Sequence, residues 1–262
     1  MVKKALLLIK DKHEGALKAS LKIKDILKAF RVNYSEEFLS DKDLDLKFED
    51  VDLLISVGGD GTIIRCSRIV KANIPILGIN AGGRGILAEV KPQEFQEALE
   101  KILKGNFIIE QRMRIKVEFK GKSYPPVMNE VLLIRAEPLH TPTFKLIFSK
   151  EDELSEKMDG LLVSTPTGTT GHSYSLGGPI TYENLELFIV TPIAPLNRLP
   201  SLILPPNPLS LVANQECLLV LDGQFYEKVD SGEMVQVKKH EEPVRFVRLH
   251  KRSLRQLHNL GF

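Results

Sequence analysis

Several residue types are scarce in this chain of 262 residues: it has no tryptophan and two cysteines, and its formal net charge is only +2. Cys66 and Cys217 lie far apart, and neither has a cysteine or histidine neighbour at the spacing of metal ligands, so we interpret both as small core side chains. The nearly balanced charge predicts no basic stripe. Nucleic acid is therefore not an expected partner.

Long apolar runs are also missing. No stretch approaches the length needed to cross a bilayer, and the first run, Ala5 to Ile9, ends at Lys10, too early for a signal-peptide core. We interpret that run as a first strand, and we expect a cytoplasmic protein without membrane contact. With 43% hydrophobic and 27% charged residues, the composition is that of a globular protein, and the length allows one large domain or two ordinary ones.

Several common catalytic and nucleotide-binding signatures are absent. The chain has no GxxxxGK[ST] segment, no HRD or DFG element of protein kinases and no GxSxG elbow. Gly59-Asp60-Gly61 also fails as GxGxxG, because Ile64 occupies the third glycine position. These absences exclude a P-loop enzyme and a protein kinase.

The first part of the chain, residues 1–106, alternates between apolar runs and helix-like segments. This pattern predicts an α/β domain with a mostly parallel sheet, because alternating strands and helices are joined by right-handed crossovers. The predicted strands cover 5–9, 31–34, 51–57 and 75–79, and the predicted helices cover 14–30, 62–71 and 92–104, with Pro92 in the first turn of the last helix. The acidic stretch 40–45 is interpreted as a solvated loop.

The rest of the chain, from residue 107, has a different sequence pattern. Short β-like runs separated by turn residues predict a β-rich, sandwich-like second domain over 107–250. Residues 251–262 are expected to form a short helical tail that packs back onto the first domain. The predicted strands are 107–111, 115–119, 131–135, 144–148, 161–164, 185–191, 218–221 and 244–249.

One aspartate, Asp60, lies where a bound phosphate is expected. The apolar run Val51 to Val57 stops at three glycines that surround Asp60, and a helix-like segment follows. Ligands of open α/β sheets bind at the carboxyl ends of strands, and glycines there let backbone N–H groups approach phosphates. A carboxylate in that place is suited to hold Mg²⁺ or to take a proton from a hydroxyl. The alternative is a glycine turn whose aspartate only caps a helix.

Two further segments carry polar groups next to predicted strands. The loop from Ser164 to Ser175 is dense in hydroxyls and glycines, which suit the oxygens of ribose and phosphate, although a plain surface loop is the alternative. Asn129 and Glu130 precede an apolar run. An asparagine pairs with an adenine edge and a glutamate accepts from a ribose hydroxyl, whereas the alternative for such a pair is a turn.

In this order and spacing, the segments resemble the NAD kinase family, over roughly residues 51 to 224. GGDG by itself is shared with phosphofructokinases and lipid kinases, whereas the STPTG loop with the upstream Asn-Glu pair is far more specific. The resembling motifs are Gly58-Gly59-Asp60-Gly61-Thr62, Gly78-Ile79-Asn80-Ala81-Gly82, Asn129-Glu130, Asp159-Gly160, Ser164-Thr165-Pro166-Thr167-Gly168-Thr169-Thr170, Gly177-Gly178-Pro179, Thr191-Pro192-Ile193 and Asp222-Gly223-Gln224.

The resemblance implies transfer of the γ-phosphate of ATP, or of a phosphate of polyphosphate, to the 2′-hydroxyl of the adenosine ribose of NAD. It implies that Asp60 is the catalytic residue, that Mg²⁺ accompanies ATP without a dedicated protein metal site, and that the chain forms a homodimer or homotetramer. The residues that the resemblance assigns to nucleotide binding are Gly58, Gly59, Gly61, Thr62, Arg65, Asn129, Glu130, Asp159, Thr170, Gly171, His172, Ser173, Tyr174, Ser175, Ala194 and Gln224.

The chain departs from the family pattern at two places. Gly171-His172 replaces the usual Ala-Tyr pair, and Gly82-Gly83-Arg84-Gly85-Ile86 replaces the usual GRLGF. His172 either stacks on or donates to the dinucleotide or is merely solvated, and Arg84 is a candidate for the donor phosphates. Two other functions stay open: a lipid or diacylglycerol-type kinase that shares GGDG, and a catalytically silent dinucleotide sensor.

Overall fold

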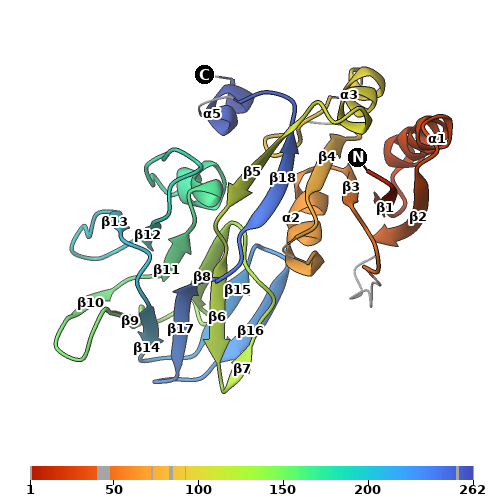
Figure 1. Ribbon diagram of the computed structural model, residues 1–262. Coiled ribbons are helices and arrows are strands. Elements are labelled where there is room, and N and C mark those ends of the chain that lie inside the picture. The colour runs from red at the N-terminus through yellow and green to blue at the C-terminus, as the bar shows by residue number, and fades with distance from the viewer. Residues whose placement is uncertain are drawn as a thin grey trace. The chain divides into compact units, whose positions relative to one another are not determined.

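The computed structural model describes residues 2–39, 48–71, 73–82, 85–91, 93–251 and 254–261. The chain divides into two compact units, one of residues 1–112 with 243–262 and the other of residues 113–242. Figure 1 shows the elements of both units. Three features considered above, the acidic stretch 40–45, Arg84 and Pro92, lie outside the described residues.

The first unit is built on a six-stranded sheet in the order β2-β1-β3-β4-β18-β5. The first five strands of that order run parallel, and β5 runs antiparallel to β18. The parallel core confirms the predicted fold class. The strands are β1 Lys4–Lys10, β2 Asn33–Leu39, β3 Leu53–Gly58, β4 Ile76–Asn80, β5 Ile108–Arg112 and β18 Val244–Arg248.

Helices cover both faces of this sheet. The helices α1 (Glu14–Ala29) and α3 (Phe95–Leu103) pack against each other and share one apolar core with alternate residues of β1, β3 and β4. The helix α2 (Asp60–Ile69) lies on the opposite face. Its Ile63 packs closely against Gly78 of β4, and a Cβ on Gly78 would lie only 2.6 Å from Ile63 Cδ1. Strands buried on both faces need continuous apolar runs, which is why β1 and β3 were recognisable from the sequence.

The second unit is a sandwich of two antiparallel six-stranded sheets, as predicted. Apolar side chains from both sheets meet in one core, with Val117, Phe144 and Leu211 from one sheet and Leu133, Val163 and Leu219 from the other. One sheet comprises β10 Glu153–Lys157, β9 Thr143–Ile147, β14 Leu209–Ala213, β17 Met234–Lys239, β6 Ile115–Phe119 and β7 Lys122–Ser123. The other comprises β13 Leu202–Leu204, β12 Phe188–Ile193, β11 Gly160–Ser164, β8 Glu130–Arg135, β15 Cys217–Leu221 and β16 Phe225–Val229, with the short helices η1 (Thr167–Thr170) and α4 (His172–Ser175) after β11.

The division of the chain differs from the one expected at 106 and 250. β5 and β18 belong to the first sheet, where β18 pairs with β4 through Phe246 and Ile76 and with β5 along its length. A strand's pattern reveals its type but not its partner, because pairing across more than 130 residues leaves no local trace. The short helix α5 (Arg255–Leu260) also belongs to this unit, and Gln256 Oε1 accepts a hydrogen bond from Arg112 Nη1 at 3.0 Å.

Charged side chains are buried inside the first unit. Arg112 and Arg248 are each 1% exposed, and both donate to Glu110 Oε1, at 2.7 to 3.0 Å. Glu89 Oε2 accepts from Arg255 at 2.6 Å and from Arg248 at 3.3 Å. The two arginines beside Glu110 hold the pKa of that carboxyl below its usual value despite the opposing effect of burial, so it stays ionised.

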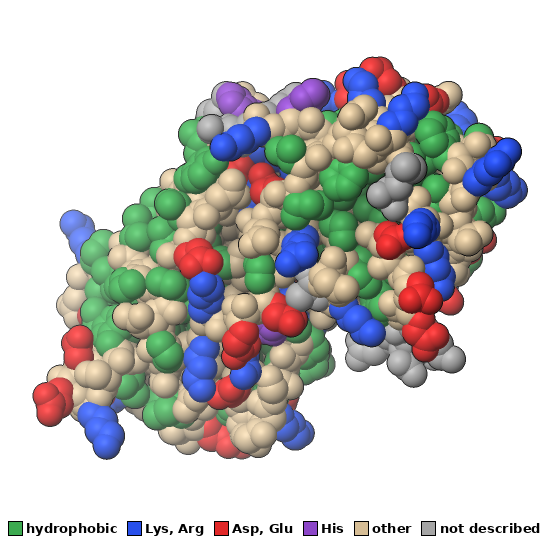
Figure 2. All heavy atoms as spheres, in the orientation of Figure 1, with side chains coloured by type: hydrophobic (Ala, Val, Ile, Leu, Met, Phe, Trp, Pro, Cys, Tyr) green, Lys and Arg blue, Asp and Glu red, His purple; other side chains and the backbone are tan. Residues whose placement is uncertain are grey.

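The visible surface is of mixed charge. Figure 2 shows Lys and Arg interspersed with Asp and Glu over the described part of one face. One cluster of charged side chains is formed by Glu118, whose Oε2 lies 2.6 Å from Lys238 Nζ and whose Oε1 lies 3.2 Å from Lys116 Nζ. In the part of the chain that the structure describes, no helix is both long and apolar enough to span a membrane.

We predict that Glu89→Gln destabilises the protein by about 3–5 kcal/mol, because Arg248 and Arg255 would then be buried with less compensating charge. Urea denaturation followed by circular dichroism measures this. Glu97→Gln is the matched control, since Glu97 pairs with Lys101 on the exposed side of α3 and should leave the midpoint unchanged. A wild-type midpoint for Glu89→Gln would contradict the prediction.

Candidate functional site

Asp60 lies where the first unit's sheet ends and a helix begins. Gly58 is the last residue of β3, Gly59 caps the helix, and Asp60 is the first residue of α2, which starts two residues before the predicted start at 62. The side chain of Thr62 fills the space where a Cβ on Gly58 would lie. Gly58 therefore lets the first turn of α2 fold tightly against the end of β3.

Two backbone N–H groups hold the Asp60 carboxylate. Ile86 N donates to Oδ2 at 2.8 Å and Leu87 N donates to Oδ1 at 3.0 Å. An ionised carboxylate offers about four acceptor positions, so each oxygen keeps one for another donor. The arrangement fixes the direction of the carboxylate and leaves it able to accept from a hydroxyl.

The strand order places Asp60 at the position where open α/β sheets bind ligands. From β1 the chain passes through α1 to β2 on one side, whereas from β3 it passes through α2 to β4 on the other side. Ligands bind outside the carboxyl ends of strands where the order reverses in this way. His13 caps α1 at the same edge and accepts from Ala16 N at 3.1 Å.

In the second unit, the start of β8 is held by Asp222. Its carboxylate accepts from Met128 N at 2.9 Å, Asn129 N at 2.7 Å and Glu130 N at 3.1 Å. Asp222 has a φ of 52° and forms the β15–β16 hairpin turn together with Gly223 and Gln224. Asp222 was part of a recognised motif but was not predicted as a site residue, because its contact with residues 128–130 appears only in the fold.

Asn129 and Glu130 carry buried polar atoms that lack partners. Glu130 Oε2 and Asn129 Oδ1 are buried and have no hydrogen-bond partner among the described residues. Burial and then the negative charge of Asp222 raise the pKa of Glu130 from 4.5 to about 8. A native protein pairs nearly all buried polar groups, so two such atoms on adjacent residues indicate a site for a polar ligand.

The hydroxyl loop after β11 packs beside these two residues. Thr165 Oγ1 donates to Met128 O at 2.6 Å, and Thr165 N donates to Asn129 O at 2.8 Å. Thr170 ends η1, and a Cβ on the following Gly171 would lie 3.9 Å from Glu130 Oε2 and 4.0 Å from Asn129 Nδ2. The structure thus brings Asn129 and Glu130 beside the predicted residue Gly171, which directly follows Thr170.

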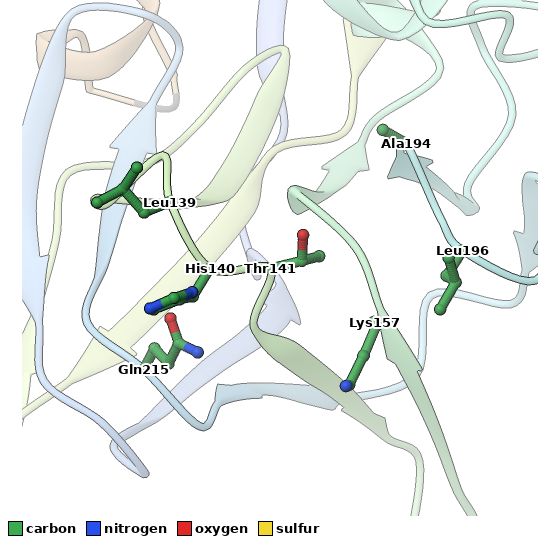
Figure 3. A pocket seen from close by; sticks show the side chains of 7 residues that line it. All are labelled: Leu139, His140, Thr141, Lys157, Ala194, Leu196 and Gln215. Atoms are coloured by element: carbon green, nitrogen blue, oxygen red, sulfur yellow. The ribbon is translucent and has the colours of Figure 1, made fainter.

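A hollow of about 480 Å³ lies beside β10 and β12 and has the predicted residue Ala194 in its lining. Figure 3 shows Leu139, His140 and Gln215 on one side of it, Ala194 and Leu196 on the other, and Lys157 between them. Lys157, which brings a cation to the hollow, was missed, because nothing in its local sequence marks it. Asp159, two residues further, pairs with Arg135 Nε at 3.2 Å.

The remaining predicted residues are more dispersed. In α4, Ser173 is buried against Thr191, with 3.1 Å between their hydroxyls, whereas His172, Tyr174 and Ser175 are exposed. Gln224 is exposed in the β15–β16 turn. In the first unit, Gly61 and Thr62 lie in the first turn of α2, and Arg65 is half-buried in the middle of that helix.

The models of two domains of one protein family together match most of the chain. Residues 9–107 match the ATP-NAD kinase N-terminal domain, and residues 128–249 match the ATP-NAD kinase C-terminal domain. The chain belongs to the NAD kinase family. This confirms the resemblance inferred from the motifs.

Relatives and solved structures agree with this membership. An NAD kinase of Thermococcus sibiricus is 34% identical over 92% of both chains, and one of Pyrococcus furiosus is 33% identical over 92% of both. The crystal structure of an NAD kinase from Archaeoglobus fulgidus in complex with ATP has a TM-score of 0.81 and 28% identity, and covers 98% of this chain and 97% of its own. The yeast NADH kinase complexed with NADH, with a TM-score of 0.79, 19% identity and coverage of 100% of this chain and 87% of its own, shows the same fold.

For this NAD kinase family member we predict a stability change with pH that depends on Glu130. Between pH 4.5 and about 8 the folded protein keeps a proton that the unfolded chain releases, so the free energy of unfolding falls as pH rises. Glu130→Gln lacks this proton. The variant should gain stability relative to the wild type by up to about 1.4 kcal/mol per pH unit between pH 5 and 8, measured by urea denaturation.

Glu118→Gln is the control for this measurement. Hydrogen bonds from Lys238 and Lys116 lower the pKa of Glu118, so Glu118 is ionised in both the folded and the unfolded protein from pH 5 to 8. The difference between Glu118→Gln and the wild type should therefore stay constant. A constant difference for Glu130→Gln as well would show that Glu130 is ionised in the folded protein.

Proposed function

We propose that this chain transfers the γ-phosphate of ATP to the 2′-hydroxyl of the adenosine ribose of NAD and so makes NADP. The observation that carries the proposal is the Asp60 carboxylate, held by two backbone N–H groups at the start of α2 in a chain of the NAD kinase family. The relatives named above are NAD kinases, and one was solved with ATP. Polyphosphate is the alternative donor that the assay below includes.

In this reaction Asp60 accepts the hydrogen bond, and then the proton, of the 2′-hydroxyl. The 2′ oxygen forms a bond to the γ-phosphorus while the bond to the β–γ bridging oxygen breaks, and ADP leaves. Phosphoryl transfer passes through a loose transition state, so alignment of the hydroxyl contributes more than its full deprotonation. The N–H groups at the start of α2, around Gly59, Gly61 and Thr62, are suited to bind phosphate oxygens.

Mg²⁺ fits this reaction as part of the nucleotide substrate. Within the described ranges no cluster of three or more side chains could hold a metal ion by itself. Mg²⁺ commonly binds through one or two carboxylates together with the phosphates of its nucleotide. Asp60 is the residue that would share it, and the ion would neutralise charge on the phosphates.

The second unit supplies groups suited to the dinucleotide. Protonated Glu130 can both donate to and accept from a ribose hydroxyl, and Asn129 Oδ1 is an acceptor for the amino group of adenine. Thr170 and Gly171 flank this pair, and His172, Tyr174, Ser175 and Gln224 are exposed and available for contact. These two adjacent polar groups, buried without a partner among the described residues, favour a nucleoside over a lipid as the acceptor.

The hollow with Ala194 and Lys157 is proposed to take another part of the dinucleotide. Its lining combines the apolar Leu139 and Leu196 with a cation, which suits a molecule that carries both rings and phosphates. Asp159 lies between β10, which ends at Lys157, and β11, which begins at Gly160. We propose that this region binds NAD rather than ATP.

We further propose that the chain forms a homodimer or homotetramer through the outer face of the β13–β16 sheet. Tyr226 is 73% exposed and Ile203 is 56% exposed, and both point away from the sandwich core, since their strand neighbours pack into it. Val220, which pairs with Tyr226, and Leu218 extend the apolar surface around Tyr226 at one edge of this sheet, and Ile203 lies on β13 at the opposite edge. Apolar patches of this kind mark protein contacts.

The assay for the activity is NADP formation from purified protein with NAD, Mg²⁺ and either ATP or polyphosphate. Asp60→Asn should lower kcat by roughly two to four orders of magnitude, the usual effect of losing a general base. Asp25→Asn, a change at an exposed position of α1, is the control and should be fully active. Tight NAD binding by the wild type without turnover on either donor would overturn the kinase and favour the silent sensor.

A second prediction concerns the hollow. Lys157→Ala should raise KM for NAD roughly tenfold, the loss expected for one charge-assisted hydrogen bond, while kcat stays near the wild-type value. Lys145→Ala is the control, because Lys145 pairs with Glu153 on the surface at 2.7 Å. A KM that rises for ATP and not for NAD would assign the hollow to the donor instead.

A further inference from the structure

A short segment of the first unit, residues 85–90, lies between the catalytic end of α2 and the C-terminal part of the chain. We call it the strap. Its end is tied to β4, where Val90 O accepts from Asn80 N at 2.9 Å and Glu89 N donates to Gly78 O at 3.0 Å. Its beginning, Gly85, packs against the side chain of Asn80 so closely that a Cβ would collide with it. Both ends of the strap are thus fixed to the same strand.

The middle of the strap bonds in two directions. The N–H groups of Ile86 and Leu87 donate to the two oxygens of Asp60, as described above. The carbonyl groups of the same two residues accept from the C-terminal part of the chain: Asn259 Nδ2 donates to Ile86 O at 2.8 Å, and Arg248 Nη1 donates to Leu87 O at 3.1 Å. In the peptide group that joins Ile86 to Leu87, the carbonyl accepts from Asn259 and the N–H donates to Asp60, so a rotation of this group would disturb both bonds. Leu87 O belongs to the next peptide group, which Arg248 fixes.

The residues that hold the strap are themselves fixed by buried charges. Arg248 is anchored by Glu110 and Glu89, and Leu249 N donates to Glu89 Oε1 at 2.8 Å. Helix α5, which carries Asn259, is held by Arg255 on Glu89 at 2.6 Å and by Gln256 on Arg112 at 3.0 Å. A helix of six residues has little stability of its own, so these contacts set its position.

We propose that Asn259 of α5 and Arg248 of β18 are positioning residues that hold the Asp60 carboxylate in its reactive direction through the Ile86–Leu87 peptide groups. The proposal rests on the proposed catalytic role of Asp60. The C-terminal helix then contributes to catalysis without touching a substrate. Alignment of a catalytic group to within about 1 Å governs rate, so loosening the strap should lower kcat more than it weakens substrate binding.

The test uses the full-length protein with Asn259→Ala, because Asn259 is half-buried and its loss leaves the buried ion pairs intact. We expect kcat for NADP formation to fall roughly tenfold, while KM for NAD and for ATP and the urea midpoint stay close to the wild type. Asn259→Gln keeps the amide N–H and should recover part of the rate. His258→Ala, an exposed neighbour on the same helix, should behave as the wild type.

Hydrogen exchange of the strap provides a readout that does not depend on turnover. In Asn259→Ala the amides of Ile86 and Leu87 should exchange faster than in the wild type and in His258→Ala. An unchanged kcat would overturn the proposal, whatever the exchange rates. A fall in kcat that is explained entirely by a lower urea midpoint would overturn it as well, because unfolding would then account for the lost rate. Asp60→Asn is assayed in parallel: if it is fully active, the catalytic role of Asp60 fails, whereas an inactive Asp60→Asn beside a fully active Asn259→Ala rejects only the positioning role.

Discussion

Asp60 and Asp222 each accept hydrogen bonds from consecutive backbone N–H groups, two in the first case and three in the second. A carboxylate held in this way fixes the turn that supplies the donors, because hydrogen bonds to a charged acceptor are stronger than those between neutral groups. The first unit uses this bond to direct a carboxylate, whereas the second uses it to shape the start of β8.

The two carboxylates act differently on their surroundings. Asp60 keeps acceptor capacity for a hydroxyl, which suits proton transfer. The Asp222 carboxylate accepts hydrogen bonds from three backbone N–H groups. The burial of Glu130 and the negative charge of Asp222 together raise the pKa of Glu130 to about 8. A buried, unpaired carboxyl is costly to stability, and such costs are typical of sites that bind a polar ligand.

Buried charge also connects the ends of the first unit. Glu89 and Glu110 pair with Arg112, Arg248 and Arg255, which come from strands and a helix that are far apart in the chain. Such pairs contribute less to net stability than to a unique arrangement, since removing one member leaves an uncompensated charge. Here they bring Arg248 and Asn259 against the strap that holds Asp60, so two residues from the C-terminal part of the chain become part of the surroundings of the Asp60 carboxylate.

Sequence by itself determined the local features of this protein. Continuous apolar runs predicted β1, β3 and β4, turn-separated short runs predicted the sandwich, and the spacing of GGDG, Asn129-Glu130 and the STPTG loop indicated the family. Tertiary structure alone decided that β5 and β18 complete the first sheet, that Asp222 holds residues 128–130, that Lys157 shares a hollow with Ala194, and that Asn259 reaches Ile86. The physical reason is the range of the interaction. Periodicity and turn chemistry depend on neighbouring residues, whereas strand partners and single hydrogen bonds between residues 93 to 173 positions apart depend on how the whole chain folds.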